Sequence, residues 1–322
     1  MGRAALRPWP GSGRSACSAR TNDGCSTRTH TMIESTTHRI HTTDGYPIQV
    51  TRWKPTVAPH AICIILHGVQ SHAGWYHRLG RSLAESGIEA HFPDRRGSGS
   101  NHQDRGHCPS SGRLITDVLE ICRSVREPHP SLPVILGGIS WGGKLVVTSA
   151  ARQPNLIQGI ALICPGLEPR VGVSTSERLR IAAAFFVNRK AHFPIPLADP
   201  ALFTANPEAQ RFIANDPLSL RTASAALLAA STFLDRKARR APSRVEQPCL
   251  LMLAEHDRIV NNDRTRAYLE RLKSLDKTII EYPDAHHTLE FEPDPDRYAQ
   301  DLVDWINARW ASHHQRNQVA SD

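Results

Sequence analysis

The chain has 322 residues, 40% of them hydrophobic, and a formal net charge of +8 at pH 7. This length suits one large α/β domain that carries an insertion, and it provides enough chain for a full hydrophobic core. Half of the net charge comes from residues 1–31, which hold five arginines and one aspartate. The remainder is mildly basic and has no stripe of basic and aromatic residues, so we expect no nucleic-acid partner.

The seven cysteines lack CxxC pairs and histidines at zinc-ligand spacing. We therefore expect neither a zinc site nor a disulfide framework. Cys63 and Cys164 lie within apolar runs, which is typical of inert thiols in a reducing compartment. No run approaches the ~18 apolar residues of a membrane span, and the N-terminus lacks an apolar signal core. These features favour a cytoplasmic protein, with peripheral contact at a membrane as an open alternative.

Residues 1–31 are rich in arginine, serine, threonine and glycine and show almost no apolar periodicity, so we expect a disordered basic tail. Their composition fits a transit peptide, and it also fits an extension ahead of a start at Met32. From Met32 to Trp53 apolar and polar residues alternate, as they do in β-strands with one buried face.

From Thr51 onward, short apolar runs alternate with longer amphipathic segments, which predicts a parallel sheet covered by helices on both faces. The predicted strands are residues 61–66, 89–93, 133–139, 159–164, 249–254 and 277–282. The predicted helices are residues 76–85, 114–125, 144–152, 263–272 and 297–310.

This alternation stops between about residues 168 and 245, where the pattern is that of helices and loops and phenylalanines are frequent. We interpret residues 168–245 as an insertion that divides the α/β core into 32–167 and 246–315. The C-terminal stretch is polar from His313, and we expect a frayed end at 316–322.

The strongest local signal is Gly138-x-Ser140-x-Gly142, which follows an apolar run and precedes a helical pattern. A serine at so tight a strand-to-helix turn has a strained backbone that exposes its Oγ. The flanking positions must lack bulk so that strand and helix can approach each other. We expect Ser140 to be a catalytic nucleophile, the alternative being a glycine-rich turn with a structural serine.

In folds with this turn, the acid and then the base follow the nucleophile along the chain. Asp257 comes just after the strand predicted at 249–254, at the carboxyl edge of the sheet. His286 and His287 follow the strand predicted at 277–282, at the same edge. The order predicts a triad of Ser140, Asp257 and one of these histidines, although loop histidines are often merely solvated.

Two backbone amides are expected to form an oxyanion hole. One belongs to Trp141, directly after the nucleophile, and the other to Val69, in the loop after the first buried strand. Gly68 would allow the backbone to approach closely. His67 has no partners at metal-ligand spacing, and we expect it to brace this loop.

At this point the chain resembles the α/β-hydrolases of the monoacylglycerol lipase and lysophospholipase type, which are grouped in domain terms with the serine aminopeptidases. The resemblance covers most of residues 33–312. The segment HGVQSHAGWY at 67–76 is similar to the family's HGxxxHxxxY pattern, and DRRGSGS at 94–100, followed by RGH at 105–107, to its DxxGxGxS and RGH patterns. The remaining matches are GISWG at 138–142, DRIV at 257–260 and AHHTL at 285–289.

The resemblance implies an α/β-hydrolase fold, a helical cap formed by residues 168–245, and His287 rather than His286 as the base. It implies no metal and no organic cofactor. The chain departs from the family pattern at Ala254, where glycine is frequent, and at Val69-Gln70, where a small Ala-Gly pair is common. Neither change removes a backbone N–H, so we expect the second to affect only the shape near the scissile bond.

The predicted activity is hydrolysis of single-chain acyl esters, such as monoacylglycerols or lysophospholipids, through an acyl-enzyme on Ser140. Phe185 and Phe186 lie in an apolar stripe with cationic edges, which suits an acyl chain or a lipid surface. The same stripe would also suit a cap helix that packs on its own domain. The alternatives for function are an aminopeptidase of the same fold and a catalytically inactive binding protein. The sequence assigns no oligomeric state.

Overall fold

The computed structural model describes residues 33–319, with side chains described as far as residue 311. Its centre is an eight-stranded sheet with the strand order β1-β2-β4-β3-β5-β6-β9-β10. The strands β1 and β2 pair antiparallel, β2 pairs antiparallel with β4, and every other neighbouring pair is parallel. Their bounds are β1 Ser35–His41, β2 Pro47–Trp53, β3 Ala61–Leu66, β4 Ile88–Pro93, β5 Val134–Ile139, β6 Gly159–Ile163, β9 Cys249–Ala254 and β10 Lys277–Tyr282.

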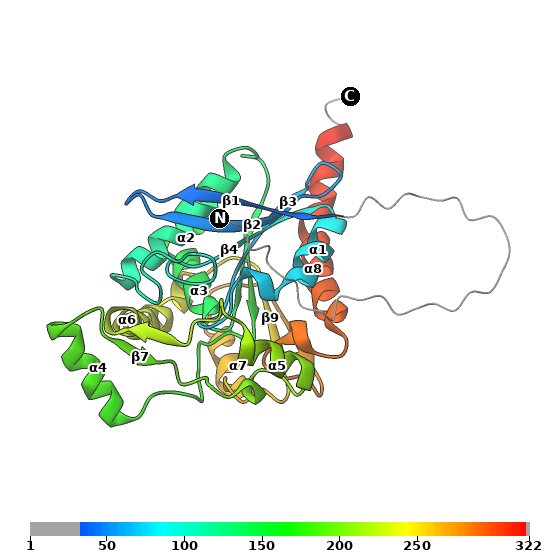
Figure 1. The fold of residues 1–322 in the computed structure, drawn as a ribbon. Helices are drawn as coiled ribbons and strands as arrows, with labels where there is room; N and C mark the ends of the chain where they lie inside the picture. The colour runs from blue at the N-terminus through cyan, green and yellow to red at the C-terminus, as the bar shows by residue number, and fades with distance from the viewer. Residues whose placement is uncertain (1–32, 320–322) are drawn as a thin grey trace.

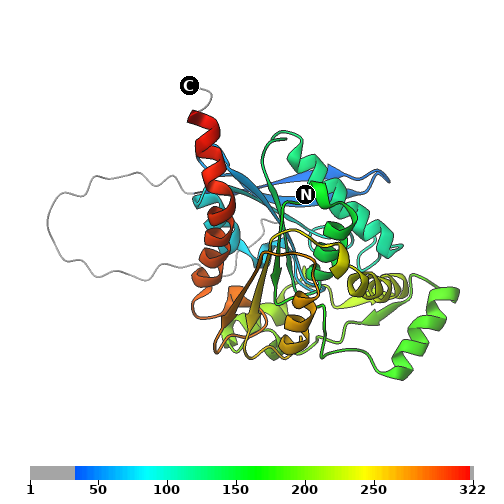
Figure 2. The same cartoon turned by 180° about the vertical axis from the view of Figure 1, so that it is seen from behind.

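Helices cover both faces of this sheet (Figures 1 and 2). Helices α1 and α8 pack against each other on one face, and α2 and α3 pack together on the other, where α3 contacts β5 and β6. Their bounds are α1 His77–Glu85, α2 Ser111–Arg126, α3 Gly142–Arg152, α7 Asn262–Glu270 and α8 Pro295–Val319. This arrangement confirms the predicted α/β-hydrolase fold.

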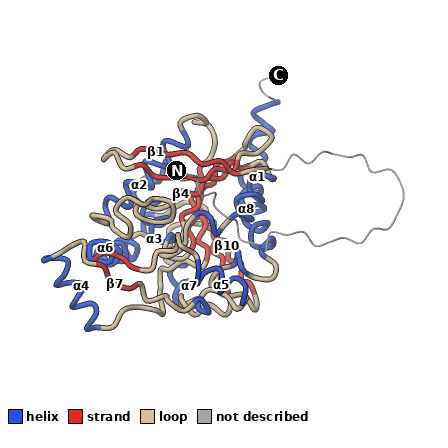
Figure 3. Tube along the Cα trace, in the orientation of Figure 1, coloured by secondary structure: helices blue, strands red, loops and turns tan. Residues whose placement is uncertain are grey.

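The central strands are buried along their whole length because both of their faces lie under helices. Every residue of β3, β5 and β9 is buried, which explains why these strands read as continuous apolar runs. The edge strand β1 is exposed at every position except Ile40. The sheet core therefore lies in the parallel strands, and Figure 3 shows the strands in red at the centre of the molecule with helices around them.

Several predicted bounds are corrected by the structure. Helix α2 begins at Ser111 because the Ser110 side chain accepts a hydrogen bond from the Arg113 amide and caps its first turn. Helix α8 continues to Val319, so the backbone is helical over the first residues of the end that is predicted to fray, 316–322. Residues 320–322 and the predicted basic tail at 1–31 lie outside the described residues.

The segment between β6 and β9 contains the whole of the predicted insertion, residues 168–245. Its elements are α4 Thr175–Val187, β7 His192–Pro194, η4 Pro200–Leu202, α5 Pro207–Asn215, β8 Thr222–Ser224, α6 Ala225–Arg240 and η5 Pro242–Arg244. The antiparallel pair β7–β8 was not predicted, because three-residue strands are too short to show a period of two. Helix α6 packs on α3 and α4 packs on α6, while α4 projects at the edge of the molecule in Figures 1 and 2.

Strand register brings the chemically important loops together. Leu66 at the end of β3 pairs with Gly138 in β5, and Ile139 pairs with Ile163 in β6. Strand β9 follows β6 in the sheet, and Tyr282 at the end of β10 pairs with Ala254 at the end of β9. The loops after β3, β5, β9 and β10 therefore leave from one edge of the sheet, as ligand-binding loops do in such folds.

Candidate active site

Ser140 occupies the turn between β5 and α3 with a backbone φ of 53°. This left-handed conformation is strained for a residue with a side chain, as expected for a nucleophile at such a turn. A Cβ on Gly138 would lie 2.6 Å from the Gly142 carbonyl carbon, and one on Gly142 would lie 2.3 Å from the Leu66 oxygen. The turn therefore requires glycine on both sides of the serine.

Asp257 and His287 form a buried hydrogen-bonded pair. The Nδ1 atom of His287 lies 2.7 Å from Oδ2 of Asp257, and the two side chains are 2% and 0% exposed. The other carboxylate oxygen of Asp257 accepts the amides of Ile259 and Val260, at 2.8 and 2.9 Å. These bonds orient the carboxylate so that it holds the proton on Nδ1 of the histidine and leaves Nε2 as the base.

Ser140 and His287 line the same small cavity, and the Nε2 atom of His287 is buried without a hydrogen-bond partner among the described residues. His286 lies differently. Its Nδ1 is 3.5 Å from Glu292 and its ring lies 5.7 Å from that of His256, away from this cavity. The structure thus brings His287, and not its neighbour, to the cavity lined by Ser140, the predicted nucleophile.

The amides of Val69 and Trp141 flank Ser140, and neither donates a hydrogen bond to another group in the described part of the chain. Trp141 also caps the N-terminus of α3, where the helix dipole favours negative charge. A Cβ on Gly68 would lie 3.3 Å from the Cβ of Ser140, so glycine keeps this loop close to the nucleophile. Both amides are therefore available to bind an oxyanion.

Arg95 is a site residue that sequence reasoning missed. Its guanidinium is buried, donates to the Gly68 and Val69 carbonyls at 3.1 Å each, and stacks 4.8 Å above the Trp141 ring. It forms no salt bridge with the described carboxylates, and burial lowers its pKa to about 10, so it stays charged at neutral pH. The Gly68 carbonyl belongs to the same peptide plane as the Val69 amide, so this bond polarises that amide.

His67 supports the same loop, as expected. Its Nδ1 lies 2.7 Å from the Gly68 oxygen, and its Nε2 accepts the Arg95 amide at 2.8 Å. Burial and the adjacent guanidinium of Arg95 hold the pKa of His67 well below its usual value. The neutral ring can therefore donate from one nitrogen and accept at the other, which is a bracing role.

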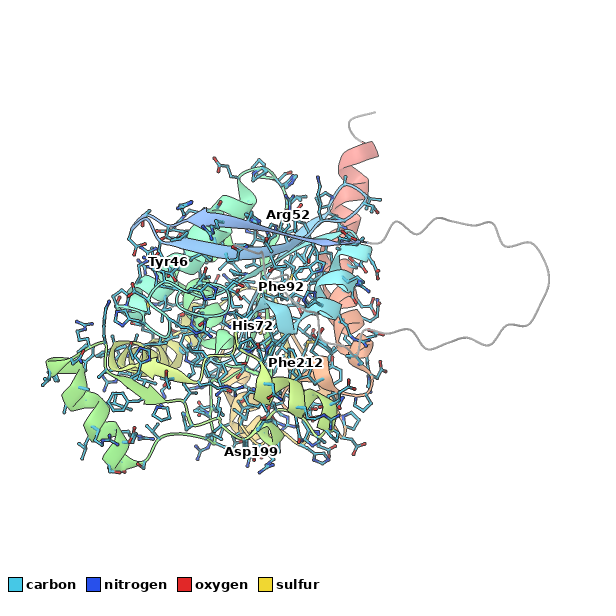
Figure 4. The ribbon with its side chains drawn as sticks, in the orientation of Figure 1. Tyr46, Arg52, His72, Phe92, Asp199 and Phe212 are labelled. Carbon is cyan, nitrogen blue, oxygen red and sulfur yellow. The ribbon has the colours of Figure 1, made fainter. Side chains whose placement is uncertain are left out.

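The loop after β3, which carries Val69 and His72, also forms hydrogen bonds with the insertion. The Nε2 atom of His72 lies 3.0 Å from the Asp216 carboxylate, which also accepts from the Trp75 indole at 2.8 Å (Figure 4 labels His72). The pKa of Asp216 is lowered: burial raises it, but the hydrogen bond and charge of His72 more than offset that rise. These buried bonds fix the loop after β3 against the segment that follows α5.

Helix α6 is joined to the nucleophile turn at two points. The Trp141 indole donates to Ser231 Oγ at 2.8 Å, and Lys144 Nζ lies 2.5 Å from the Asp235 carboxylate. Ser231 and Asp235 are four residues apart, so they lie on one face of the helix. In the sequence, the single indication of this contact is Lys144, a charged residue directly after the Gly142-Gly143 pair.

A large cavity of about 1000 Å³ opens next to Ser140. Phe185 and Phe186 both line it, as expected of the cap candidates, although the side chain of Phe186 is 85% exposed. Phe185 packs against a small cluster around Ile181 and lies under the Arg189 guanidinium at 4.4 Å. The apolar lining also includes Val69, Ile195, Leu197, Ala223, Leu227, Leu228 and Ile259.

Within residues 33–319, one group of three potential metal ligands lies close together, formed by Glu255, His256 and Asp284. All three are exposed, and none lines either cavity at Ser140. None of the helices in the described part of the chain is long and apolar enough to cross a membrane.

The site geometry agrees with a match between residues 57–294 and the family described as serine aminopeptidase, S33. The chain belongs to this hydrolase family. Among its relatives, the monoacylglycerol lipase of Mycolicibacterium smegmatis is 25% identical over 84% of this chain and 96% of its own. The human monoglyceride lipase is 28% identical over 77% and 82% of the two chains.

Solved structures of two lipases have the same fold. The Paleococcus ferrophilus monoacylglycerol lipase superposes with a TM-score of 0.73 at 23% identity, covering 81% of this chain and 98% of its own. A soluble variant of monoglyceride lipase from Saccharomyces cerevisiae, in complex with a substrate analogue, gives a TM-score of 0.75 at 17% identity over 88% and 97%.

Proposed function

We propose that this protein is a serine hydrolase that cleaves carboxylic esters with a single acyl chain, such as monoacylglycerols or lysophospholipids. The observation that carries the proposal is the apolar cavity of about 1000 Å³ that opens on Ser140 beside two free amides. Such a cavity accommodates an acyl chain while its carbonyl lies at the nucleophile. The relatives named monoacylglycerol lipase and monoglyceride lipase support the same substrate class.

The geometry supports the following reaction. Ser140 Oγ attacks the ester carbonyl while His287 Nε2 takes its proton, and the Val69 and Trp141 amides bind the oxyanion. Asp257 keeps the imidazole oriented and stabilises its protonated form. His287 then returns the proton to the leaving alcohol, which gives an acyl-enzyme that water hydrolyses. Each of these steps is assigned to a group of this chain.

Charge at the cavity separates this proposal from aminopeptidase activity. Asp235 is the single carboxylate among the described residues that line the cavity, and it is paired with Lys144. The other charged residues of the lining are Arg170, Arg178, Arg236 and Arg239. A cationic peptide terminus would be repelled there, whereas an uncharged or anionic lipid would not be.

We further propose that residues 168–245 act as a cap and that α4 makes transient contact with a lipid surface. Leu179, Phe186 and Val187 are 69%, 85% and 88% exposed, and the first two lie seven residues apart on one helical face. Basic residues precede and follow them along the chain. An apolar stripe with cationic ends is suited to an interface with anionic lipid.

The test is a panel of acetyl to dodecanoyl esters, monoacylglycerols, lysophospholipids and aminoacyl amides, assayed with the wild type and with Ser140→Ala. We expect medium-chain or long-chain esters to be the best substrates. Ser140→Ala should lose at least ~10⁴-fold in kcat and all labelling by a fluorophosphonate. Aminoacyl amides that outrun every ester, or an alanine variant that labels normally, would reject the proposal.

A further inference from the structure

Ser140 lies between two cavities of very different size. Beside the large cavity, a second one of about 10 Å³ is lined mainly by the loop after β3 and by the loop that carries His287. Its volume is close to the ~10–15 Å³ needed for one water molecule.

Gln70 is a buried polar residue in the lining of this small cavity. It is 2% exposed, yet neither Oε1 nor Nε2 of its amide has a hydrogen-bond partner within the described chain. Its backbone is fixed, because its carbonyl accepts the Leu220 amide at 2.9 Å. A buried amide without partners is unfavourable, and its presence in a folded protein calls for an explanation such as a bound water molecule.

His287 Nε2 is the other buried polar atom without a partner in this lining, among residues that the structure describes. The hydroxyls of Ser71 and Tyr76 also line the cavity, but they bond to each other at 3.0 Å. Buried water usually makes two to four hydrogen bonds to groups that are otherwise unsatisfied. The cavity offers such groups on Gln70 and on the base, next to the nucleophile.

We propose that the small cavity holds the water that hydrolyses the acyl-enzyme, and that the Gln70 amide orients it. This inference rests on the proposed esterase mechanism. The water donates one O–H to His287 Nε2 and the other to Gln70 Oε1, so one lone pair is directed at the acyl carbon on Ser140. Gln70 is thus a positioning residue for the second half of the reaction.

In the proposed hydrolysis of the acyl-enzyme, each bond that forms is matched by one that breaks. The water oxygen attacks the acyl carbon as His287 Nε2 takes one of its protons, and the carbonyl becomes an oxyanion at Val69 and Trp141. The intermediate collapses, the bond from the acyl carbon to Ser140 Oγ breaks, and His287 returns its proton to that oxygen. The products are a carboxylic acid and free Ser140, and the O–H bonded to Gln70 is not broken.

At Val69-Gln70 the sequence departs from the small Ala-Gly pair that is common in similar lipases. From sequence alone the change was expected to affect only shape. The structure assigns it a chemical consequence, because Gln70 lines the cavity and its buried amide has no hydrogen-bond partner among the described residues, whereas glycine would supply no amide side chain. Esterases with glycine at this position would need a different partner for the water.

The decisive variant is Gln70→Leu, which keeps the bulk of the side chain and removes the amide, assayed on p-nitrophenyl octanoate. We expect kcat to fall about tenfold or more and KM to fall with it, so that kcat/KM stays within about threefold. Since kcat/KM reports acylation, this split places the loss in deacylation. Rapid mixing should show a burst of one p-nitrophenol per enzyme. Gln70→Met carries the same expectations if leucine does not fit.

Added methanol gives a second readout. Methanol has a single O–H, which goes to His287, so its attack on the acyl-enzyme does not depend on Gln70. In Gln70→Leu the ratio of methyl ester to free acid should therefore rise about tenfold over the wild type. An unchanged ratio, or equal losses in kcat and kcat/KM without a burst, would overturn the inference.

The matched control is Gln247→Leu. Gln247 is also a buried glutamine, but its amide donates to the Ala150 and Pro154 carbonyls, away from both cavities. It should lower the melting temperature and leave the burst and the methanol ratio unchanged. Failure of the proposed function looks different, since neither the wild type nor any variant would then turn over the ester or label at Ser140.

Discussion

At the scale of single residues, the candidate chemistry depends on atoms that buried neighbours hold in place. The Asp257 carboxylate is fixed by two backbone amides before it meets His287. Arg95 and His67 contact the Gly68 carbonyl oxygen, and these contacts fix the peptide plane that contains the Val69 amide. Preorganised donors of this kind cost no reorganisation when charge develops in the transition state.

Arg95→Met should lower kcat by roughly 10- to 100-fold, because the polarised amide and a nearby positive charge are lost together. KM should change little, since the oxyanion forms only in the transition state. The melting temperature should hold or rise, because a buried cation without a carboxylate partner is removed. Binding of an alkylboronic acid, which forms a tetrahedral adduct on Ser140, should weaken in parallel with kcat/KM.

Arg126→Met is the control for this prediction, since Arg126 also donates to two backbone carbonyls but lies at the far end of α2. Its kinetics should match the wild type. A drop in melting temperature for Arg95→Met with unchanged boronate affinity would show that Arg95 only supports the fold.

Alanine substitutions of the two adjacent histidines test which of them is the catalytic base. His287→Ala should cripple turnover because the buried partner of Asp257 is lost, whereas His286→Ala should stay within about tenfold of the wild type. Steady-state assays at a single pH suffice. The reverse ranking would contradict the assignment of His287.

At the scale of elements, the two long helices of the insertion differ in how firmly they are attached. Helix α6 is joined to the nucleophile turn through Trp141 and Lys144. Helix α4 has Ile181 as its single buried residue. Elements with few buried contacts open at low free-energy cost, so α4 is the part of the insertion suited to admit a substrate.

Replacing both Phe185 and Phe186 with alanine should flatten the dependence of kcat/KM on acyl length. In the wild type, each two-carbon step from acetyl toward octanoyl should raise kcat/KM severalfold, because a buried methylene is worth up to ~0.8 kcal/mol. Turnover of acetyl esters should not change. The exposed Leu275, which lines neither cavity, provides the control Leu275→Ala. An unchanged slope in the double variant would show that these rings do not contact the chain.

At the scale of the whole molecule, a buried carboxylate links the catalytic loop to the helices behind it. Glu290 follows His287 by three residues, accepts the Arg78 amide at 2.8 Å, and bonds the Tyr298 hydroxyl on α8. Burial raises the pKa of Glu290 to about 7. The folded protein therefore keeps a proton on this group over a pH range in which the unfolded chain has released it.

Because the folded pKa lies above the unfolded value, the contribution of Glu290 to stability is lost as pH rises toward 7. Glu290→Gln retains an uncharged side chain and should remove this dependence. Between pH 5 and pH 8, the free energy of unfolding of the wild type should fall by roughly 3 kcal/mol relative to the variant. Urea unfolding of both proteins at the two pH values measures this difference, and a constant difference would contradict it.

The central strands and the tight turn at Ser140 could be predicted from the sequence, because these features depend on short local patterns. The short apolar run at 133–139 has the length of a buried strand rather than of a helix. Glycines two residues from Ser140 are required by contacts of under 3 Å. The order of Asp257 and His287 after strand ends also sufficed to place them at one edge. Resemblance to a family selected His287 over His286.

The distant residues that support the predicted catalytic groups could be identified only from the folded structure. Arg95, Gln70 and Ser231 show no local pattern, since their roles come from partners that are 20 to 90 positions away or from a cavity between loops. The three-residue strands β7 and β8 carry no period and form because the chain folds back on itself. Hydrophobic periodicity specifies elements, whereas buried polar contacts and cavities exist only once those elements have packed together.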